Sequence, residues 1–496
     1  MLNFQKFIFF ILLSLVQSHP DEIFLRIQDY QVKLPIDNDI VEGMVKNHSR
    51  IGISEKIVRQ TKTDITDPLN AFFYVRDGLY QEQTIKNVLK EGSATLKQLR
   101  SLEKIVPLKE DDLTSAAKQI FNLQLTYNLS STYFTDGLEG PTYCARPLKI
   151  FSIFQIALIA CELKRYYHCI DWMENVDSKK KIDWDPRVLR EKQLEAIGLA
   201  LLLQGNLKRA WLVSRELSRL NPKKEGARKN VVQLKKFLKG RELEDLEYIP
   251  PLNNRLTGDS PLNRVCRNYN TIPFYQNSTA ICYYQRRSYI SHFKVQMIYL
   301  DPLIRVYHDV LGDAAATKLR TLSKGNLKRG LVFNSNTGVV SATPTRTSLT
   351  ADLRNITDIE LERIDRMVEE MTGLDPKAGE ALKVNNYGIG GLYKPHYDHI
   401  LNATAAPPAT GRRIATALFY LNTPHKGGAT VFTKLNIHVA PAKGSAIFWY
   451  NLHEDGSGDD RTQHAGCAVL SGEKWIANKW IFERGQEFRR RCTIRK

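Results

Sequence analysis

The stretch GGLYKPHYDHI, residues 390–400, places a histidine and an aspartate two positions apart behind a Gly-rich turn. In a chain with 11 histidines, about half of one such H-x-D pattern is expected by chance. The chain has two others, His19 with Asp21 and His453 with Asp455, so the pattern needs support from its surroundings. If the stretch is a strand, His396 and Asp398 point to the same face, as two ligands of one metal ion must.

The surroundings of this stretch are rich in short β-type segments. From Ala381 onward they alternate with turns, in the order RIATALFYLN, GGATVF, NIHVAP, AIFWYNL, AGCAVL and EKWIANKWIF. This rhythm predicts a β-sandwich or barrel. Within TQHAGCAV, His464 offers a third ligand from a distant strand. Two histidines and one carboxylate on one face form the ligand set of non-heme Fe(II) oxygenases, which leaves metal positions open for other ligands.

A lysine follows the second histidine at a spacing that is typical of a hairpin. Lys474 stands ten residues after His464, and the Ser471-Gly472 turn between them predicts adjacent strands of one hairpin. On the Lys474 strand, Asn478 and Trp480 share its face by period two. A cation inside an apolar barrel is unfavourable unless an anion meets it. A dicarboxylate co-substrate that reaches from the metal to Lys474 would meet this need.

The length and composition of the sequence limit the number of domains and the classes of partner. A chain of 496 residues suggests two to four domains, and 43% hydrophobic with 25% charged residues indicates a globular protein. The formal net charge of +18 leaves open nucleic acid, a membrane surface, an acidic protein partner or simply a solvated basic surface. The absence of zinc-finger spacing or a compact basic helix argues against nucleic acid.

The N-terminus predicts that the protein enters the secretory pathway. An early lysine, an apolar core from Phe7 to Leu13 and short residues before His19 predict a signal peptide at residues 1–18. The other apolar run, IFSIFQIALIAC, is too short for a membrane span and predicts a buried helix. We therefore expect no membrane span, and five N-x-S/T sequons agree weakly with a secretory glycoprotein.

Seven cysteines in an oxidising compartment favour disulfides. From proximity in the sequence we predict the pairs Cys266–Cys282 and Cys467–Cys492. The three remaining cysteines are an odd number, so at least one of them stays unpaired. They are Cys144, Cys161 and Cys169.

Residues from about 20 to 245 show the three-and-four apolar spacing of helices. The segment QGNLKRAWLVSRELSRLNPKKEGA, residues 204–227, is more specific. Gly205, Ala210 and Pro222 fall where a tetratricopeptide repeat has its turn residue, its helix-crossing alanine and its terminal proline. An ordinary helical hairpin remains the alternative.

Taken together, these motifs resemble the collagen prolyl 4-hydroxylase alpha-subunit family. NYGIGGLYKPHYD, GRRIATALFYLN, GGATVF, AIFWYNL, TQHAGCAVL and KWIANKWIFERGQEFRRRC occur in that order between Val384 and Cys492. DPLNAFFYV and DDLTSAAKQIFNLQLTYNL resemble the family's N-terminal region, and the repeat-like segment resembles its peptide-substrate-binding domain. The similarity extends over most of the sequence.

The resemblance implies a multidomain α + β protein with a helical N-terminal half and a C-terminal double-stranded β-helix, or jelly roll. The implied segments are a signal peptide at 1–18, a helical N-terminal or dimerisation region at 19–135, a tetratricopeptide-like peptide-binding domain at 136–245, a linker at 246–295 and an Fe(II)/2-oxoglutarate dioxygenase domain at 296–496.

The resemblance also implies roles for individual residues. His396, Asp398 and His464 would bind Fe(II), and Lys474 would bind the far carboxylate of the co-substrate 2-oxoglutarate. Six other residues match positions near the co-substrate or the peptide. They are Tyr387 and Thr430 for the co-substrate, Tyr393 and Trp480 for the peptide at the catalytic domain, and Tyr166 and Tyr167 for the peptide at the helical domain, where KRYYHCIDWME also supplies Trp172.

The implied reaction is the hydroxylation of C4 of a peptidyl proline, with O₂ and 2-oxoglutarate consumed, succinate and CO₂ formed, and L-ascorbate keeping the iron reduced. The implied partner is protein disulfide isomerase in an α₂β₂ tetramer in the lumen of the endoplasmic reticulum. Two alternatives remain open. One is a 2-oxoglutarate oxygenase with a non-collagen target, and the other is an inactive peptide-binding subunit, which predicts a broken ligand set.

Overall fold

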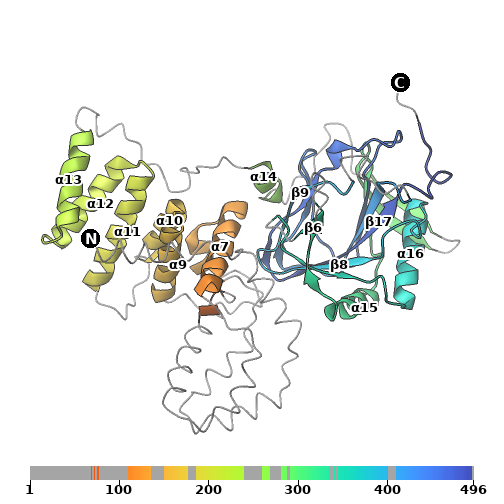
Figure 1. The fold of residues 1–496 in the computed structure, drawn as a ribbon, viewed down its shortest axis with the longest axis horizontal. Coiled ribbons are helices and arrows are strands. Elements are labelled where there is room, and N and C mark those ends of the chain that lie inside the picture. The colour runs from red at the N-terminus through yellow and green to blue at the C-terminus, as the bar shows by residue number, and fades with distance from the viewer. Residues whose placement is uncertain are drawn as a thin grey trace, which may run out of the picture. The chain divides into compact units, whose positions relative to one another are not determined.

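The computed structural model describes residues 69, 72, 75–76, 110–135, 150–176, 186–238, 260–267, 281–287, 291–333, 340–341, 345–399 and 409–493. The predicted signal peptide and Cys144 lie outside these residues. The molecule divides into two compact units, one formed by residues 117–260 and the other by residues 1–116 with 261–496. Figure 1 colours the helices of the first unit orange to yellow-green and the strands of the second green to blue.

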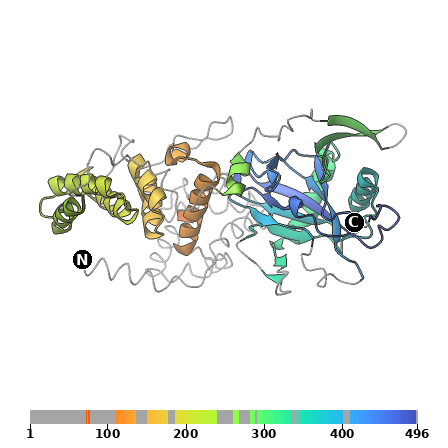
Figure 2. The same cartoon turned by 90° about the horizontal axis from the view of Figure 1, so that it is seen from above.

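The first unit is helical throughout its described residues. Its helices are α7 (Glu110–Tyr127, which belongs to this unit from residue 117 onward), α8 (Ser131–Thr135), α9 (Ile150–Glu162), α10 (Tyr166–Val176), α11 (Pro186–Leu203), α12 (Leu207–Leu220) and α13 (Glu225–Leu238). From α9 to α13, each helix packs on the next one along the sequence, as the stack in Figure 2 shows. This order confirms the prediction of a helical N-terminal half.

The repeat-like segment folds as its spacing predicts. Gly205 has a positive φ of 78° in the turn before α12, a conformation that glycine adopts without steric penalty. Ala210 has no exposed surface where α12 crosses its neighbours, and Pro222 comes just after the residue that caps the end of this helix. The apolar run IFSIFQIALIAC forms α9, with most of its side chains buried. Among the described residues, no helix is long and apolar enough to cross a membrane.

The second unit is built on two facing sheets. A nine-stranded sheet has the order β1-β2-β3-β14-β10-β17-β8-β7-β4, and a four-stranded sheet has the order β13-β12-β15-β9. Two pairs, β11–β16 and β5–β6, complete the strands. One core lies between the two sheets, and a second lies where α15 (Asp313–Lys324) and α16 (Ile359–Thr372) cover the outer face of the larger sheet (Figure 1). This architecture confirms the predicted jelly roll.

The strands of these sheets have the following bounds. The large sheet contains β1 (Ile281–Arg286), β2 (His292–Tyr299), β3 (Ile304–His308), β4 (Lys328–Arg329), β7 (Leu349–Asp352), β8 (Lys383–Tyr387), β10 (Arg413–Tyr420), β14 (Ala446–Tyr450) and β17 (Lys474–Phe482). The small sheet contains β9 (Tyr393–His396), β12 (Thr430–Phe432), β13 (Ile437–Val439) and β15 (His464–Gly466). The paired short strands are β5 (Val332–Phe333), β6 (Val340–Ser341), β11 (Lys426–Gly427) and β16 (Val469–Ser471).

The predicted linker at 246–295 is wrong in its second half. Its described residues from 261 onward form α14 (Pro261–Arg267), β1 and the start of β2. They belong to the second unit, which we call the β unit, as we call the first the helical unit. The segment lacks a clear hydrophobic period because β1 is an edge strand whose side chains are mostly exposed. The composition of residues 246–295 therefore resembled that of a linker.

The predicted disulfides are also wrong. Cys266 pairs with Cys467 and not with Cys282, and the two Cα atoms lie 5.7 Å apart. The reason is that α14 packs against the small sheet and buries Cys266 beside Cys467 in one apolar cluster. Cys282, on the edge strand β1, and Cys492 are free and exposed. In the helical unit, Cys161 pairs with Cys169 across the α9–α10 turn, with Cα atoms 4.8 Å apart.

The Ser471-Gly472 turn does not close a hairpin between His464 and Lys474. β15 pairs with β12 and β9 in the small sheet, whereas β17 pairs with β10 and β8 in the large sheet. The backbone therefore passes from the small sheet through β16, which pairs with β11, to the large sheet. His464 and Lys474 face each other across the space between the sheets instead of side by side within one.

Candidate functional site

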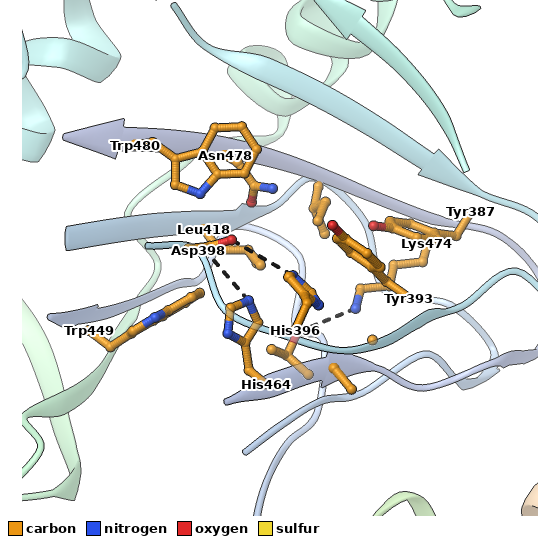
Figure 3. A pocket seen from close by; sticks show the side chains of 14 residues that line it. Tyr387, Tyr393, His396, Asp398, Leu418, Trp449, His464, Lys474, Asn478 and Trp480 are labelled. Carbon is orange, nitrogen blue, oxygen red and sulfur yellow. Dashed lines mark hydrogen bonds and ion pairs between the residues drawn. The ribbon is translucent and has the colours of Figure 1, made fainter. Parts of the chain in front are cut away.

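The predicted metal ligands come together between the sheets. His396 ends β9, His464 begins β15, and these two residues are register partners in the antiparallel pair. Asp398 follows two residues beyond the end of β9, so the expectation that both members of H-x-D lie within one strand is wrong by two residues. The ligand atoms of all three side chains lie within 4.8 Å of one another (Figure 3).

The geometry of the cluster suits a cation. Asp398 Oδ1 lies 3.7 Å from His396 Nε2, and Asp398 Oδ2 lies 3.6 Å from His464 Nε2. Two donors on one ion, each about 2.1 Å from it, are at most about 4.2 Å apart. Among the described residues, the carboxylate of Asp398 forms ion pairs with these two imidazoles alone, although it is 6% exposed. A buried carboxylate between two imidazoles is an environment that a divalent ion stabilises.

Both imidazoles are held in the tautomer that a metal requires. His396 Nδ1 donates to the carbonyl of Lys394 at 2.8 Å, and His464 Nδ1 donates to the carbonyl of Thr462 at 3.0 Å. Since a carbonyl only accepts, each Nδ1 carries the proton, and Nε2 is the nitrogen that each ring directs toward Asp398. Burial, aided by His464, lowers the pKa of His396 to about 3, so its ring is neutral at neutral pH.

The carboxylate of Asp398 is held ionised and fixed in place. Burial alone raises its pKa, but the nearby His464, His396 and Arg413 outweigh burial and lower the pKa to about 2. Thr416 Oγ1 donates to Asp398 Oδ2 at 2.8 Å, and Asn451 Nδ2 donates to Thr416 Oγ1 at 2.9 Å. Trp449 Nε1 donates in turn to Asn451 Oδ1 at 2.8 Å, which extends the support into the core.

Lys474 lies in the same pocket, on β17 of the opposite sheet. Its side chain is 3% exposed, and Nζ donates to Thr430 Oγ1 at 3.3 Å. Nζ also lies 5.8 Å from the ring centroid of Tyr387 and 5.6 Å from that of Tyr420. Burial lowers the pKa of Lys474 to about 7, and no ion pair joins it to a carboxylate of the described residues. A buried ammonium group in this setting favours an anionic ligand.

The pocket brings together every predicted residue of the catalytic domain. Its empty volume of about 380 Å³ includes an opening to solvent. The lining contains the metal cluster, Lys474, the two predicted co-substrate residues Tyr387 and Thr430, and the two predicted peptide residues Tyr393 and Trp480. Apolar walls come from Leu418, Trp449 and Ile476.

The two predicted tyrosines of the helical domain lie elsewhere. Tyr166 and Tyr167 are half-buried at the start of α10, in the helical unit. Trp172 of the same helix has no exposed surface and donates to Gln124 Oε1, so it belongs to the core of that unit. His399 is 5% exposed and is not part of the metal cluster.

Sequence reasoning missed two residues that support the site. Thr416 holds Asp398, and its signal was a hydroxyl in the otherwise apolar RIATALFYLN. Arg346 is 7% exposed, and its Cζ lies 4.9 Å from the ring centroid of Tyr393. Tyr393 in turn stacks on His396 with ring centroids 3.5 Å apart. No periodic pattern marks the segment that carries Arg346.

Three family models match this protein. The 2OG-Fe(II) oxygenase superfamily matches residues 382–482, and the prolyl 4-hydroxylase peptide-substrate-binding domain matches residues 151–240. The prolyl 4-hydroxylase alpha-subunit N-terminal region matches residues 16–139. The first range takes in the pocket, and the second runs from the first turn of α9 to the end of α13.

Similar proteins match over most of their length. Prolyl 4-hydroxylase subunit alpha-2 of Caenorhabditis elegans is 33% identical over 87% of this chain and 83% of the relative. Subunit alpha-1 of the same organism is 34% identical over 87% of this chain and 81% of the relative. Subunit alpha-3 of Homo sapiens is 31% identical over 87% of this chain and 84% of the relative.

Proposed function

The protein belongs to the prolyl 4-hydroxylase alpha-subunit family and carries a 2-oxoglutarate and Fe(II)-dependent oxygenase domain, and from this premise we propose which residues perform the reaction and on what substrate. The proposed reaction is hydroxylation at C4 of a proline in a collagen-like or other Pro-rich secretory protein. The observation that carries the proposal is the pocket itself, in which a two-histidine, one-carboxylate cluster faces a buried lysine.

His396, Asp398 and His464 are the proposed ligands of Fe(II). Their fit rests on the two imidazoles that present Nε2 toward one ionised carboxylate. When bound, Fe(II) supplies the activation of O₂ that the hydroxylation requires, with 2-oxoglutarate converted to succinate and CO₂. The protein's own contribution is the orientation of the ligands and the exclusion of water by the apolar walls.

Lys474 is the proposed partner of the far carboxylate of 2-oxoglutarate. Its ammonium group is buried without an anion among the described residues, and a dicarboxylate provides that anion. Thr430 supports the lysine through its hydroxyl, and the ring of Tyr387 covers it. We assign Thr430 and Tyr387 to the co-substrate side of the pocket for this reason.

Tyr393 and Trp480 are the proposed peptide contacts within the pocket. Tyr393 lies over His396, and the indole of Trp480 lies on the strand face that Lys474 shares. Pro-rich peptides are already extended in polyproline II and lose little entropy when aromatic surfaces bind them. Tyr166 and Tyr167 of α10 remain proposed peptide contacts of the helical unit.

The proposed setting is the lumen of the endoplasmic reticulum, reached by the signal peptide at residues 1–18. The proposed partner is protein disulfide isomerase in an α₂β₂ tetramer, and L-ascorbate is the proposed reductant for oxidised iron. The net charge of +18 suits an acidic partner protein.

The test measures succinate formation by the full-length protein of 496 residues. The protein is produced together with protein disulfide isomerase and supplied with Fe(II), ascorbate and 2-oxoglutarate. We expect a (Pro-Pro-Gly) repeat peptide to stimulate succinate formation, and His464→Ala to abolish it. Succinate that the peptide does not stimulate would keep the oxygenase and remove the collagen-like substrate. A soluble, iron-loaded protein that forms no succinate would instead support the inactive peptide-binding subunit.

A further inference from the structure

Two buried polar atoms of β17 residues that line the pocket have no hydrogen-bond partner within the part of the sequence that the structure describes. They are Asn478 Oδ1, an acceptor, and Trp480 Nε1, a donor. The two side chains are 8% and 6% exposed, and both line the pocket. Figure 3 shows them next to each other, above Asp398 in this view. The fold therefore leaves one donor and one acceptor directed at the pocket.

The indole of Trp480 is near Asp398, and the hydrogen bond that it directs at this carboxylate falls short of normal geometry. Trp480 lies close enough to help lower the pKa of that carboxyl, as the last of the causes after burial, the two histidines and Arg413. No hydrogen bond of normal geometry joins the two side chains, and Asp398 Oδ2 already accepts from Thr416. Nε1 of Trp480 is thus available to a ligand.

The backbone of Asn478 and the indole of Trp480 are held in place. Asn478 lies on a central strand, paired with Leu418 on one side and Lys383 on the other. Two cations lie over the indole ring of Trp480, with Arg413 Cζ at 4.2 Å and Lys383 Nζ at 5.2 Å from the ring centroid.

Glu380 fixes both of these cations. Its carboxylate accepts from Arg413 and from Lys383, each at 2.6 Å. The direction of the Trp480 donor is thus set before any ligand arrives, which reduces the entropy lost on binding.

The chemistry of the pair excludes the co-substrate as its partner. A carboxylate only accepts hydrogen bonds, so it leaves Asn478 Oδ1 unpaired. A peptide backbone presents an N–H and a C=O close together and satisfies both atoms. A buried polar atom without a partner is unfavourable, so the ligand that binds here must complete both bonds.

We propose that Asn478 Oδ1 accepts a hydrogen bond from a backbone N–H of the peptide substrate while Trp480 Nε1 donates to a backbone C=O of the same segment. The inference rests on the proposed function and adds a specificity-determining residue, Asn478. Proline has no N–H, so a neighbour of the target proline must be a residue other than proline. Asn478 thus selects against unbroken runs of proline.

The test compares (Pro-Pro-Gly) repeats with the same peptide carrying N-methylglycine at each glycine, which removes the N–H that Asn478 needs. Peptide affinity is measured without O₂ on the same protein as in the activity assay, loaded with Fe(II) and 2-oxoglutarate. We expect the unsubstituted protein to bind the N-methylated peptide about tenfold more weakly, as for the loss of one hydrogen bond. In Asn478→Leu and Asn478→Ala, we expect the two affinities to agree within about twofold.

Conformational effects of the methyl group are common to all variants and cancel in the ratio of affinities. Asn326→Ala, which changes an exposed asparagine outside the pocket, should keep the tenfold preference. A preference that survives Asn478→Leu overturns the inference, as does a lowered affinity for 2-oxoglutarate with the peptide preference intact. With either of these two outcomes, the proposed function still stands if the unsubstituted protein forms succinate that the peptide stimulates.

Discussion

Backbone carbonyls decide how the two histidines of the cluster face Asp398. Lys394 and Thr462 each stand two residues before the histidine that they orient, so the local backbone fixes both rings. Asp398 is oriented differently, by a side chain on the opposite sheet. Its hydrogen bond from Thr416 is the link between the metal cluster and β10.

Thr416→Val tests this link. Valine keeps the volume but removes the donor to Asp398 Oδ2, so we expect Fe(II) affinity to fall about tenfold or more, as for other supporting residues of metal sites. Asn451 Nδ2 also loses its acceptor, which should lower the free energy of unfolding by roughly 1–3 kcal/mol. Competition with a chelator measures the iron affinity. Thr416→Ser, which retains the hydroxyl, should restore it, and unchanged affinity in the valine variant would contradict the assignment.

Lys474 predicts a pH dependence for 2-oxoglutarate binding. Burial lowers the pKa of the lysine to about 7 in the free site, whereas a bound dicarboxylate favours the charged form and raises the pKa. Above pH 7 the free site loses its proton, so binding must restore it. We expect the affinity for 2-oxoglutarate to fall by up to about tenfold per pH unit above pH 7.

The measurement is the anaerobic dissociation constant of 2-oxoglutarate between about pH 6.5 and about 8.5, on the iron-loaded protein. Lys474→Arg provides the control, since a guanidinium does not titrate in this range and should flatten the profile. The same steep fall in the arginine variant would show that another group is responsible.

At the scale of secondary structure, the crossing between β15 and β17 makes the pocket. The backbone leaves the small sheet after β15, pairs with β11 as β16 and enters the large sheet after the next turn, so a ligand between the sheets meets His464 on one wall and Lys474 on the other. Period-two alternation predicted the shared face of Lys474, Asn478 and Trp480 correctly, because it depends on one strand alone.

Sequence reasoning failed where pairing between distant segments decides the outcome. A turn signal at Ser471-Gly472 indicates that the backbone reverses, but it does not say which sheet receives the next strand. Cys266 was matched to the nearest cysteine in the sequence, whereas the packing of α14 brings it to Cys467, 201 residues away. Edge strands such as β1 escaped notice because they bury little and show no hydrophobic period.

The Cys266–Cys467 disulfide should be a main support of the β unit. It joins α14 to the small sheet within one residue of the end of β15, and it links positions 201 residues apart. We expect Cys266→Ser or Cys467→Ser to lower the free energy of unfolding by roughly 2–5 kcal/mol, the usual effect of losing a native disulfide. Denaturant unfolding under non-reducing conditions measures this change.

Cys282→Ser and Cys492→Ser serve as matched controls, because both thiols are free and exposed. Each should leave the unfolding curve unchanged to within about 0.5 kcal/mol. A loss of stability in Cys282→Ser as large as that in Cys266→Ser would show that the pairing is the one expected from proximity in the sequence.

At the scale of the whole molecule, the helical unit has its own buried polar network. Asp171 on α10 accepts from Gln124 Nε2 at 2.9 Å and from the backbone N–H of Ser131 at 2.8 Å. Burial raises the pKa of Asp171, and Trp172 beside it donates to Gln124. The network joins α7, α8 and α10, and it contains no residue of the pocket.

Asp171→Ala therefore tests whether the two units can be weakened separately. Both donors lose their acceptor, so we expect the free energy of unfolding of the helical unit to fall by roughly 1–3 kcal/mol. Asp171→Asn keeps an oxygen that can accept from both donors and removes a buried charge, so it should leave the free energy of unfolding nearly unchanged.

Far-ultraviolet circular dichroism during urea unfolding measures the loss of helix, and chelator competition measures the affinity of the β unit for Fe(II). The alanine variant should lose peptide stimulation of succinate formation at lower urea concentrations while its iron affinity is unchanged, because the ligands of the metal and their supports all belong to the β unit. A drop in iron affinity in Asp171→Ala would show that a change in the helical unit alters the metal cluster, and the independence of the two units would have to be abandoned.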